Sequence, residues 1–237
     1  MTSKIPKIVH YTFATNKLPD EIIANIENNK KICPDYKFIF YNDSDCDLFI
    51  KTNFDQRTYN AYNKINPIYG AMKADFFRYC VLFIQGGVYI DIKSTINVNL
   101  SDIIKPDDDC ILDIRRVLEP WRKFNPTFEQ WLLIFKPRHP YLKCMIELMV
   151  KHIYTRFIPS FINKSIRMTA KQMILNITGP DAFTRAVFNV MNRFKRRFHR
   201  NIDYNNYFTY CKFKNYKQMY TMNNKKHYSE GLAPLYI

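Results

Sequence analysis

The residues with the clearest chemical potential lie in one short segment, Lys73 to Ser94, which reads KADFFRYCVLFIQGGVYIDIKS. Asp75 and Arg78 stand one helical turn apart, and a double glycine separates them from Asp91. A helix followed by a strand would bring these charged groups together. Carboxylates and cations gathered in one place can bind a polar ligand and stabilise charge that develops during a reaction.

The pattern of apolar residues predicts the elements that position this set. Residues from Phe76 to Ile84 recur at helical spacing, so a helix with a buried stripe should precede Gly86-Gly87. The glycine pair should end that helix, because glycine adopts the left-handed backbone conformation at low cost. The apolar run Val88 to Ile92 is typical of a buried strand and places Asp91 at its carboxyl end. Open α/β sheets usually bind ligands at that edge.

Strands and helices alternate in the first half of the chain, and helices dominate afterwards. This order predicts an α/β fold with a single mixed sheet. At 237 residues and 47% hydrophobic content, the chain can bury the core of one domain, residues 1–237. The expected strands are residues 5–9, 37–41 and 110–114, and the expected helices are residues 20–31, 141–154 and 181–194.

The segment around the glycine pair resembles glycosyltransferase family 32, sugar transferases that include fungal initiating mannosyltransferases and share a core motif with bacterial glucosylating toxins. The family's pattern is an acid, Arg-Tyr, Leu, Gly-Gly, an aromatic residue and Asp-X-Asp. The resemblance implies the GT-A fold of nucleotide-diphospho-sugar transferases, with a helical acceptor-side region at about 120–175. Further pieces agree with the family in order, namely Ile5 to His10, Pro34 to Tyr36, Phe38 to Asp43, Pro137 to Tyr141 and Thr178 to Pro180.

The resemblance also implies roles in binding a nucleotide-sugar donor. Asp75 and Arg78 would hold the donor sugar, and Tyr89 would line the diphosphate. Phe13 stands at the position of a family tryptophan, and its ring would stack on the nucleobase. The pair Gly86-Gly87 would belong to the same substrate-binding set.

A divalent metal, Mn²⁺ or Mg²⁺, is implied by the family's Asp-X-Asp motif. Asp91 would act in catalysis and contact the sugar or the metal, and His227 in the carboxyl-terminal segment would be a second metal ligand. Lys93 replaces the second aspartate of the motif. Strand alternation would put Asp91 and Lys93 on one face, so we expect Lys93 to reach the diphosphate as a catalytic point charge and to weaken the metal dependence. Alternatively, Lys93 points away while Asp91 and His227 hold the metal.

Plain structural interpretations stand beside these functional ones. Asp75 and Arg78 could form a structural ion pair on one helix, and the glycine pair could simply end that helix. Asp-X-Asp triplets also begin at Asp43, Asp45 and Asp107. Those three resemble a helix cap and a polar loop, whereas Asp91 alone follows a glycine pair and a buried strand.

The formal net charge is +15, with the densest run at residues 193–200, RFKRRFHR. This run could be a solvated helix end, could attract a polyanionic partner or an anionic membrane surface, or could steer an anionic sugar nucleotide. No nucleic-acid-binding motif accompanies it, so nucleic acid is not an expected partner. We expect buried thiols, because the six cysteines form no C-x-x-C pair. We expect a cytoplasmic protein, because neither a signal peptide nor a membrane-spanning run is recognisable.

Together these patterns predict a retaining glycosyltransferase that moves a hexose from a UDP- or GDP-sugar to a glycan or another hydroxyl acceptor. Retention would need no protein nucleophile if the acceptor attacked from the side that the nucleotide leaves. An alternative is a GT-A scaffold, catalytically weakened at Lys93, that binds polyanions or glycans. Nucleic-acid binding as the main role is a third hypothesis, supported only by charge and aromatic content.

Overall fold

The computed structural model describes residues 3–115, 126–157, 169–211, 213 and 233–237. A mixed six-stranded sheet forms its centre, with the strand order β2-β1-β3-β8-β5-β9. The six strands are β1 (Ile8–Thr12), β2 (Lys37–Tyr41), β3 (Gly87–Ile90), β5 (Cys110–Leu112), β8 (Leu132–Phe135) and β9 (Arg200–Asn201). β1 runs parallel to both β2 and β3, and β8 runs antiparallel to both β3 and β5. The carboxyl ends of β1 and β3 therefore meet at one edge.

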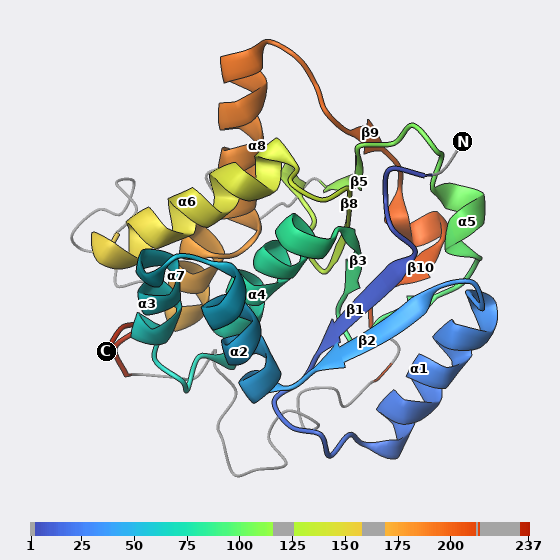
Figure 1. Cartoon of the computed structure of the whole chain (residues 1–237), viewed down its shortest axis with the longest axis horizontal. Helices are drawn as coiled ribbons and strands as arrows, with labels where there is room; N and C mark the ends of the chain where they lie inside the picture. Colours follow the sequence, from blue (N-terminus) through green and yellow to red (C-terminus); the bar gives the residue numbers. More distant parts are fainter. Residues whose placement is uncertain (1–2, 116–125, 158–168, 212, 214–232) are drawn as a thin grey trace.

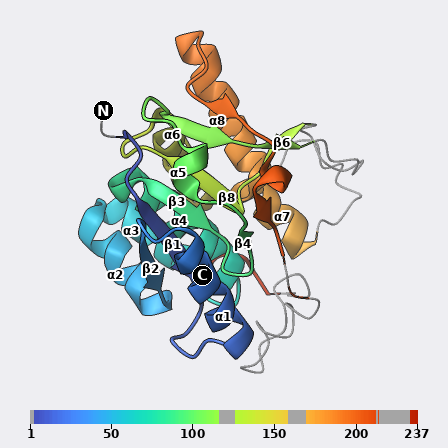
Figure 2. The same cartoon turned by 90° about the vertical axis from the view of Figure 1, so that its right-hand side faces the viewer.

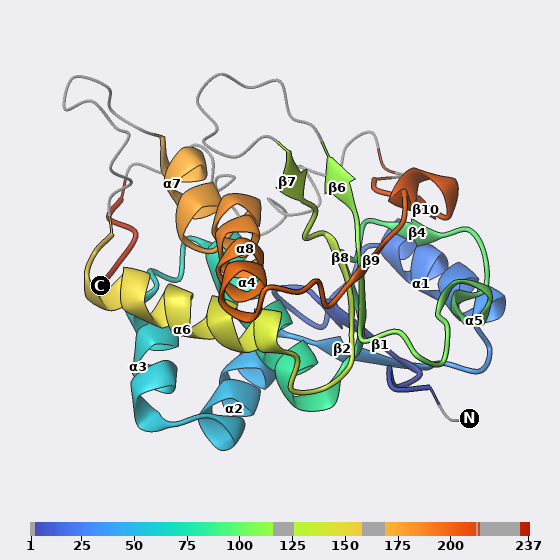
Figure 3. The same cartoon turned by 90° about the horizontal axis from the view of Figure 1, so that it is seen from above.

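Helices cover both faces of this sheet (Figure 1 and Figure 3). One face carries α2 (Asp43–Asn53), α3 (Gln56–Lys64), α4 (Gly70–Gln85), α6 (Pro140–Tyr154), α7 (Ala170–Ile177) and α8 (Pro180–Phe194). The other face carries α1 (Asp20–Ile32), α5 (Leu100–Ile103), the 3₁₀ turn Tyr204–Asn206, and a small sheet of β4 (Thr95–Ile96) and β10 (Phe208–Thr209). A second small sheet pairs β6 (Ile114–Arg115) with β7 (Thr127–Phe128).

β3 shows why its sequence is apolar throughout. Tyr89 belongs to the core under α4, whereas Val88 and Ile90 belong to the core under α1. Successive side chains of a strand point to opposite faces, and both faces of this strand are covered. The predicted α/β architecture with a mixed sheet is confirmed, but the sheet is not the single one predicted, because two small two-stranded sheets accompany it.

The junction between α4 and β3 depends on two glycines in the left-handed region. Gly86 caps α4 with a φ of 66°, and Gly87 follows with a φ of 94°. A Cβ on Gly87 would lie 2.5 Å from the carbonyl oxygen of Ile8, because the backbone of β1 passes directly beside it. The predicted helix stop is confirmed, and the tight junction fixes α4 against the sheet.

Most of the predicted elements are present, with shifts at their ends. The helix at 20–31 and the strand at 37–41 are found as α1 and β2, and α6 and α8 each begin one residue earlier than predicted, at a proline that suits the first helical turn. The first strand begins at Ile8 instead of Ile5, because Pro6 cannot donate a ladder hydrogen bond within a central strand. The strands predicted to end at Ile92 and Ile114 end at Ile90 and Leu112.

The region at about 120–175 differs from the predicted helical insertion. β8 lies within it, between β3 and β5 in the main sheet, and all four of its residues are buried. The helical part consists of α6 and α7, and α6 packs against α4 and α8. This region therefore builds part of the core, while residues 116–125 and 158–168 fall outside the described residues.

Candidate functional site

A cavity of about 390 Å³ opens at the edge of the sheet where β1 and β3 end. Thr12 and Phe13 line it from the end of β1, and Asp91 and Lys93 line it from the segment after β3. This is the edge at which α/β sheets bind ligands. The remaining wall includes Lys73, Asp75 and Arg78 of α4, Glu129 to Trp131 before β8, Lys171, Ile174 and Leu175 of α7, Pro180 of α8, and Tyr210.

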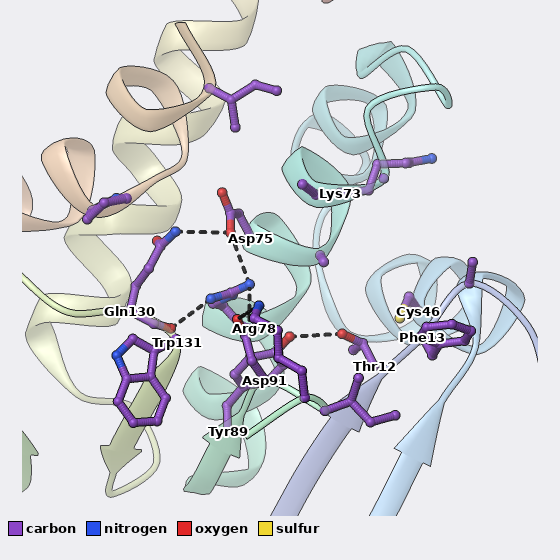
Figure 4. Close-up of a pocket in the computed structure, with 18 of the residues that line it drawn as sticks. Thr12, Phe13, Cys46, Lys73, Asp75, Arg78, Tyr89, Asp91, Gln130 and Trp131 are labelled. Carbon is purple, nitrogen blue, oxygen red and sulfur yellow. Dashed lines mark hydrogen bonds and ion pairs between the residues drawn. The ribbon is translucent and has the colours of Figure 1, made fainter. Parts of the chain in front are cut away.

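Arg78 connects the two acidic side chains that the sequence singled out (Figure 4). Its Nη2 lies 3.1 Å from Oδ1 of Asp75 and 3.3 Å from Oδ1 of Asp91. Its guanidinium carbon lies 4.7 Å from the ring centroid of Tyr89, a cation–π contact. The helical spacing of Asp75 and Arg78 predicted their pairing, and the strand end adds Asp91 to the same cluster.

Two residues without a predicted role hold this cluster from outside. Gln130 donates from Nε2 to Oδ1 of Asp75 over 3.2 Å. The backbone carbonyl of Gln130 accepts a 2.7 Å hydrogen bond from Nη1 of Arg78. The hydroxyl of Thr178 donates to Oδ2 of Asp75 over 3.0 Å. Thr178 was visible in the sequence only as part of a family landmark, and no local pattern marks Gln130.

Burial affects the two carboxylates differently. It raises the pKa of Asp75 from 3.8 to about 6, although Arg78 and Thr178 act in the opposite direction. Burial also acts to raise the pKa of Asp91, but Lys93 and Arg78 outweigh it and hold this pKa below its ordinary value. Asp91 is therefore ionised at neutral pH, and Asp75 is the carboxyl group that titrates closer to neutrality.

Lys93 reaches Asp91 by a route different from the predicted one. Because β3 ends at Ile90, Asp91 and Lys93 do not alternate along a strand. The backbone turns instead, with the amide of Ser94 donating to the carbonyl of Asp91 over 2.8 Å. Nζ of Lys93 then lies 2.7 Å from Oδ2 of Asp91 and 5.0 Å from the ring centroid of Tyr210. The two side chains therefore lie side by side, but the strand alternation from which this was expected is wrong.

The donor set of the described residues does not fit a divalent metal. Both oxygens of Asp91 contact a cation, and Asp75 is held by Arg78, Gln130 and Thr178. Among the residues that the structure describes, no three His, Cys, Asp or Glu side chains are grouped to hold a metal ion. His227, the predicted second ligand, falls outside the described residues.

The other predicted site residues divide into two groups. Phe13 and Tyr89 line the cavity, and the hydroxyl of Tyr89 lies 2.8 Å from Oγ1 of Thr12. Gly86 and Gly87 are not part of the cavity wall, because they lie at the opposite end of β3 and fix its junction with α4. The two glycines were predicted to belong to the substrate-binding set, but they do not line the cavity. Their role is to fix the junction between α4 and β3.

Two aspartates of the competing Asp-X-Asp triplets have the structural roles that were predicted. Asp45 forms a capping box with Asn42 at the start of α2. The triplet from Asp107 lies in a loop, where Asp108 pairs with Arg200 over 2.7 Å. Asp43 does line the cavity, at the exposed first turn of α2.

The basic run at residues 193–200 lies far from the cavity. Pro180 at the start of α8 lines the cavity, whereas the run begins in the last turn of this 15-residue helix, about 20 Å away along its axis at 1.5 Å per residue. This end of α8 projects beyond the sheet (Figure 2), and its residues 193–197 are exposed. None of the described helices is long and apolar enough to span a membrane.

Solved structures with this architecture identify the fold. The glycosyltransferase PaToxG superimposes with a TM-score of 0.58 at 16% identity, covering 79% of this chain and 70% of that one. The UDP-bound glycosyltransferase domain of the YGT toxin superimposes with a TM-score of 0.55 at 10% identity, covering 84% and 79%. The fold is that of a GT-A glycosyltransferase domain.

Sequence comparison shows which glycosyltransferases the chain is similar to. The family described as "glycosyltransferase sugar-binding region containing DXD motif" matches residues 19–111. The chain is 32% identical over 182 residues to an initiation-specific alpha-1,6-mannosyltransferase of Candida albicans, and 28% identical over 158 residues to a mannosyl phosphorylinositol ceramide synthase of Saccharomyces cerevisiae. Residues 19–111 therefore carry this DXD-motif region, and the chain is similar to glycosyltransferases of the family 32 type.

The matches to these two relatives include most of this chain but less than half of each relative. They cover 67% of this chain and 45% of the Candida protein, and 65% of this chain and 38% of the Saccharomyces protein. The likeness therefore concerns the sugar-transferase region that carries the motif.

Proposed function

We infer that the chain transfers a hexose from a nucleoside-diphosphate sugar to a hydroxyl group of a glycan or another acceptor, with retention of the anomeric configuration. The observation that carries this proposal is the cluster of Asp75, Arg78 and Asp91 in a cavity at the carboxyl edge of the sheet. Names of the relatives point to mannosyl transfer, and one structural neighbour binds UDP. UDP- and GDP-sugars are accordingly the candidate donors.

Each predicted residue has a physical task in this proposal. The Asp75 carboxylate would accept hydrogen bonds from sugar hydroxyls, and Arg78 would orient both carboxylates while remaining charged. The aromatic ring of Phe13 would stack on the nucleobase. Tyr89 would border the diphosphate beside Thr12.

Retention is compatible with the way Arg78 holds the acids. In retaining glycosidases a carboxylate attacks the sugar as a nucleophile. Here Arg78 forms ion pairs with both Asp75 and Asp91. Both carboxylates are therefore suited to holding the donor sugar, and neither is suited to attacking its anomeric carbon. We therefore favour attack by the acceptor from the side that the nucleotide leaves, with the departing phosphate accepting the acceptor's proton.

The acceptor would approach past α7. Lys171, Ile174 and Leu175 of α7 line the cavity. These residues lie within the region at 120–175, for which an acceptor-side role remains a proposal. Cytoplasmic location and contact with an anionic membrane surface are also proposals, and they rest on the sequence.

A donor screen tests the proposed function directly. Thermal unfolding would be followed with a panel of UDP- and GDP-sugars, each with Mn²⁺ and with chelator, because selective binding to the folded state raises the Tm. Slow hydrolysis of the stabilising donor would be measured in parallel. Saturable binding of one donor class is expected, and no binding of any nucleotide sugar under either condition would refute the proposal.

Asp75→Ala separates the sugar subsite from the nucleotide subsite. Loss of hydrogen bonds to a charged group should weaken nucleotide-sugar binding by roughly 10- to 100-fold. Binding of the nucleoside diphosphate alone should change little, because Asp75 is assigned to the sugar. Equal losses for both ligands would contradict that assignment.

A weakened scaffold that binds polyanions or glycans is the second candidate. It is favoured by one observation, the 2.7 Å pair between Lys93 and Asp91 at the position of the metal-binding motif. Saturable glycan or polyanion binding, with neither donor hydrolysis nor transfer, would support it over the transferase.

A further inference from the structure

Lys93 is placed as a fixed positive charge inside the cavity. Its side chain is only 12% exposed, it contacts Asp91 over 2.7 Å, and its Nζ lies 5.0 Å from the ring centroid of Tyr210. The hydroxyl of the neighbouring Ser94 donates to the carbonyl of Tyr210, which ties the turn to the segment after β10. An ion pair, an aromatic ring and a tethered turn thus orient the ammonium group.

The same contacts leave little anionic character for a divalent metal at Asp91. One oxygen of Asp91 faces Lys93 and the other faces Arg78. A dication at this carboxylate would have to approach two resident cations within a buried cluster, where charges of like sign repel strongly. Glu129, another acidic residue of the cavity wall, pairs with Arg115 over 3.0 Å.

We propose that Lys93 supplies the positive charge of the donor site, so that this chain binds and uses a nucleoside-diphosphate sugar without a divalent metal. The proposal rests on the proposed function and adds the identity of the charge that binds the diphosphate. An ammonium group has three donors and a full positive charge, which suits phosphate oxygens. Asp91 then positions Lys93 instead of ligating a metal.

The transfer step balances with Lys93 unchanged. The bond between the anomeric carbon and the oxygen of the distal phosphate breaks, and its electron pair remains on that oxygen. The acceptor oxygen forms the new bond to the anomeric carbon, and its proton passes to the departing diphosphate. Lys93 stays protonated and offsets the negative charge that builds on the leaving group, where a preorganised cation is most effective.

Calorimetric titration of the full chain with UDP and with GDP tests the proposal without relying on activity. In wild type, the affinity for the preferred nucleotide should agree within about twofold between EDTA and MnCl₂. Lys93→Met should weaken binding at least tenfold, and Mn²⁺ should not restore it. Lys93→Arg keeps the charge and should retain metal-independent binding, which separates loss of charge from loss of fold.

Lys136→Met is the matched control, because it removes an ion-paired lysine outside the cavity by the same substitution. Nζ of Lys136 lies 2.8 Å from Oδ1 of Asp109, and Lys136 is not among the residues that line the cavity. Nucleotide affinity should therefore change by less than about twofold in this variant.

The outcomes separate this proposal from the function on which it rests. Wild-type binding that requires Mn²⁺ and disappears in EDTA would overturn the role of Lys93 but leave the transferase intact. Unchanged affinity in Lys93→Met would do the same. Absence of nucleotide and nucleotide-sugar binding under all conditions would overturn both.

Discussion

Asp75→Asn should stabilise the fold at neutral pH while impairing use of the donor sugar. Asp75 is 5% exposed, and burial raises its pKa from 3.8 to about 6. Between pH 3.8 and about pH 6, Asp75 keeps its proton in the folded state but has lost it in the unfolded state. Above pH 6 the carboxylate is ionised in both states, and its burial then opposes folding. Asparagine has nearly the same shape and carries no charge to bury.

The magnitude follows from the shift in pKa. A rise of about two pH units, at 1.36 kcal/mol each, corresponds to about 3 kcal/mol of lost stability at pH 7.5. Asparagine can satisfy the same partners, because its carbonyl can face Arg78 and Gln130 while its amide donates to Thr178. The Thr178 hydroxyl would then donate to the carbonyl of Ile174, which lies 3.4 Å away.

Urea unfolding of both proteins from pH 4 to pH 7.5 would measure this effect. The variant should be more stable by up to about 3 kcal/mol at pH 7.5, and the Tm should rise by roughly 5 to 10 °C. The difference should fall to about half by pH 5, because wild-type Asp75 then becomes protonated in the folded state. A variant less stable than wild type at pH 7.5, or a difference independent of pH, would refute the reasoning.

Two further predictions concern the fold and the surface. Gly87→Ala should destabilise the protein by roughly 2 to 4 kcal/mol in urea unfolding, because residue 87 has a positive φ and the added Cβ would clash with Ile8. Gly70→Ala is the control. A Cβ at Gly70 meets nothing within 4 Å, so this change should cause no measurable loss of stability. Replacing the cations at residues 195–197 with glutamine should weaken salt-dependent binding to anionic vesicles, since exposed charges act over a Debye length of about 8 to 10 Å. Turnover on a small neutral acceptor should persist, and its complete loss with an intact fold would assign the run to the active site.

The sequence determined the parts of the site that depend on local geometry. The spacing of Asp75 and Arg78 on one helix was sufficient to predict their pairing, because i and i+3 side chains are neighbours on any helix. The end of α4 at Gly86 was predictable for the same kind of reason, since its backbone conformation favours glycine. Family resemblance added roles for Phe13 and Tyr89, and both residues line the cavity.

Tertiary structure decided which distant residues complete the cluster and where its strand ends. Gln130 and Thr178 reach Asp75 from 55 and 103 residues away. β3 stops at Ile90 although Ile92 continues the apolar pattern, because the chain turns at Asp91, whose carbonyl accepts from the amide of Ser94 over 2.8 Å. That turn, and not strand alternation, brings Lys93 against Asp91. Such contacts depend on how β8, α7 and α8 pack around α4, and local sequence patterns carry no record of packing between segments so far apart.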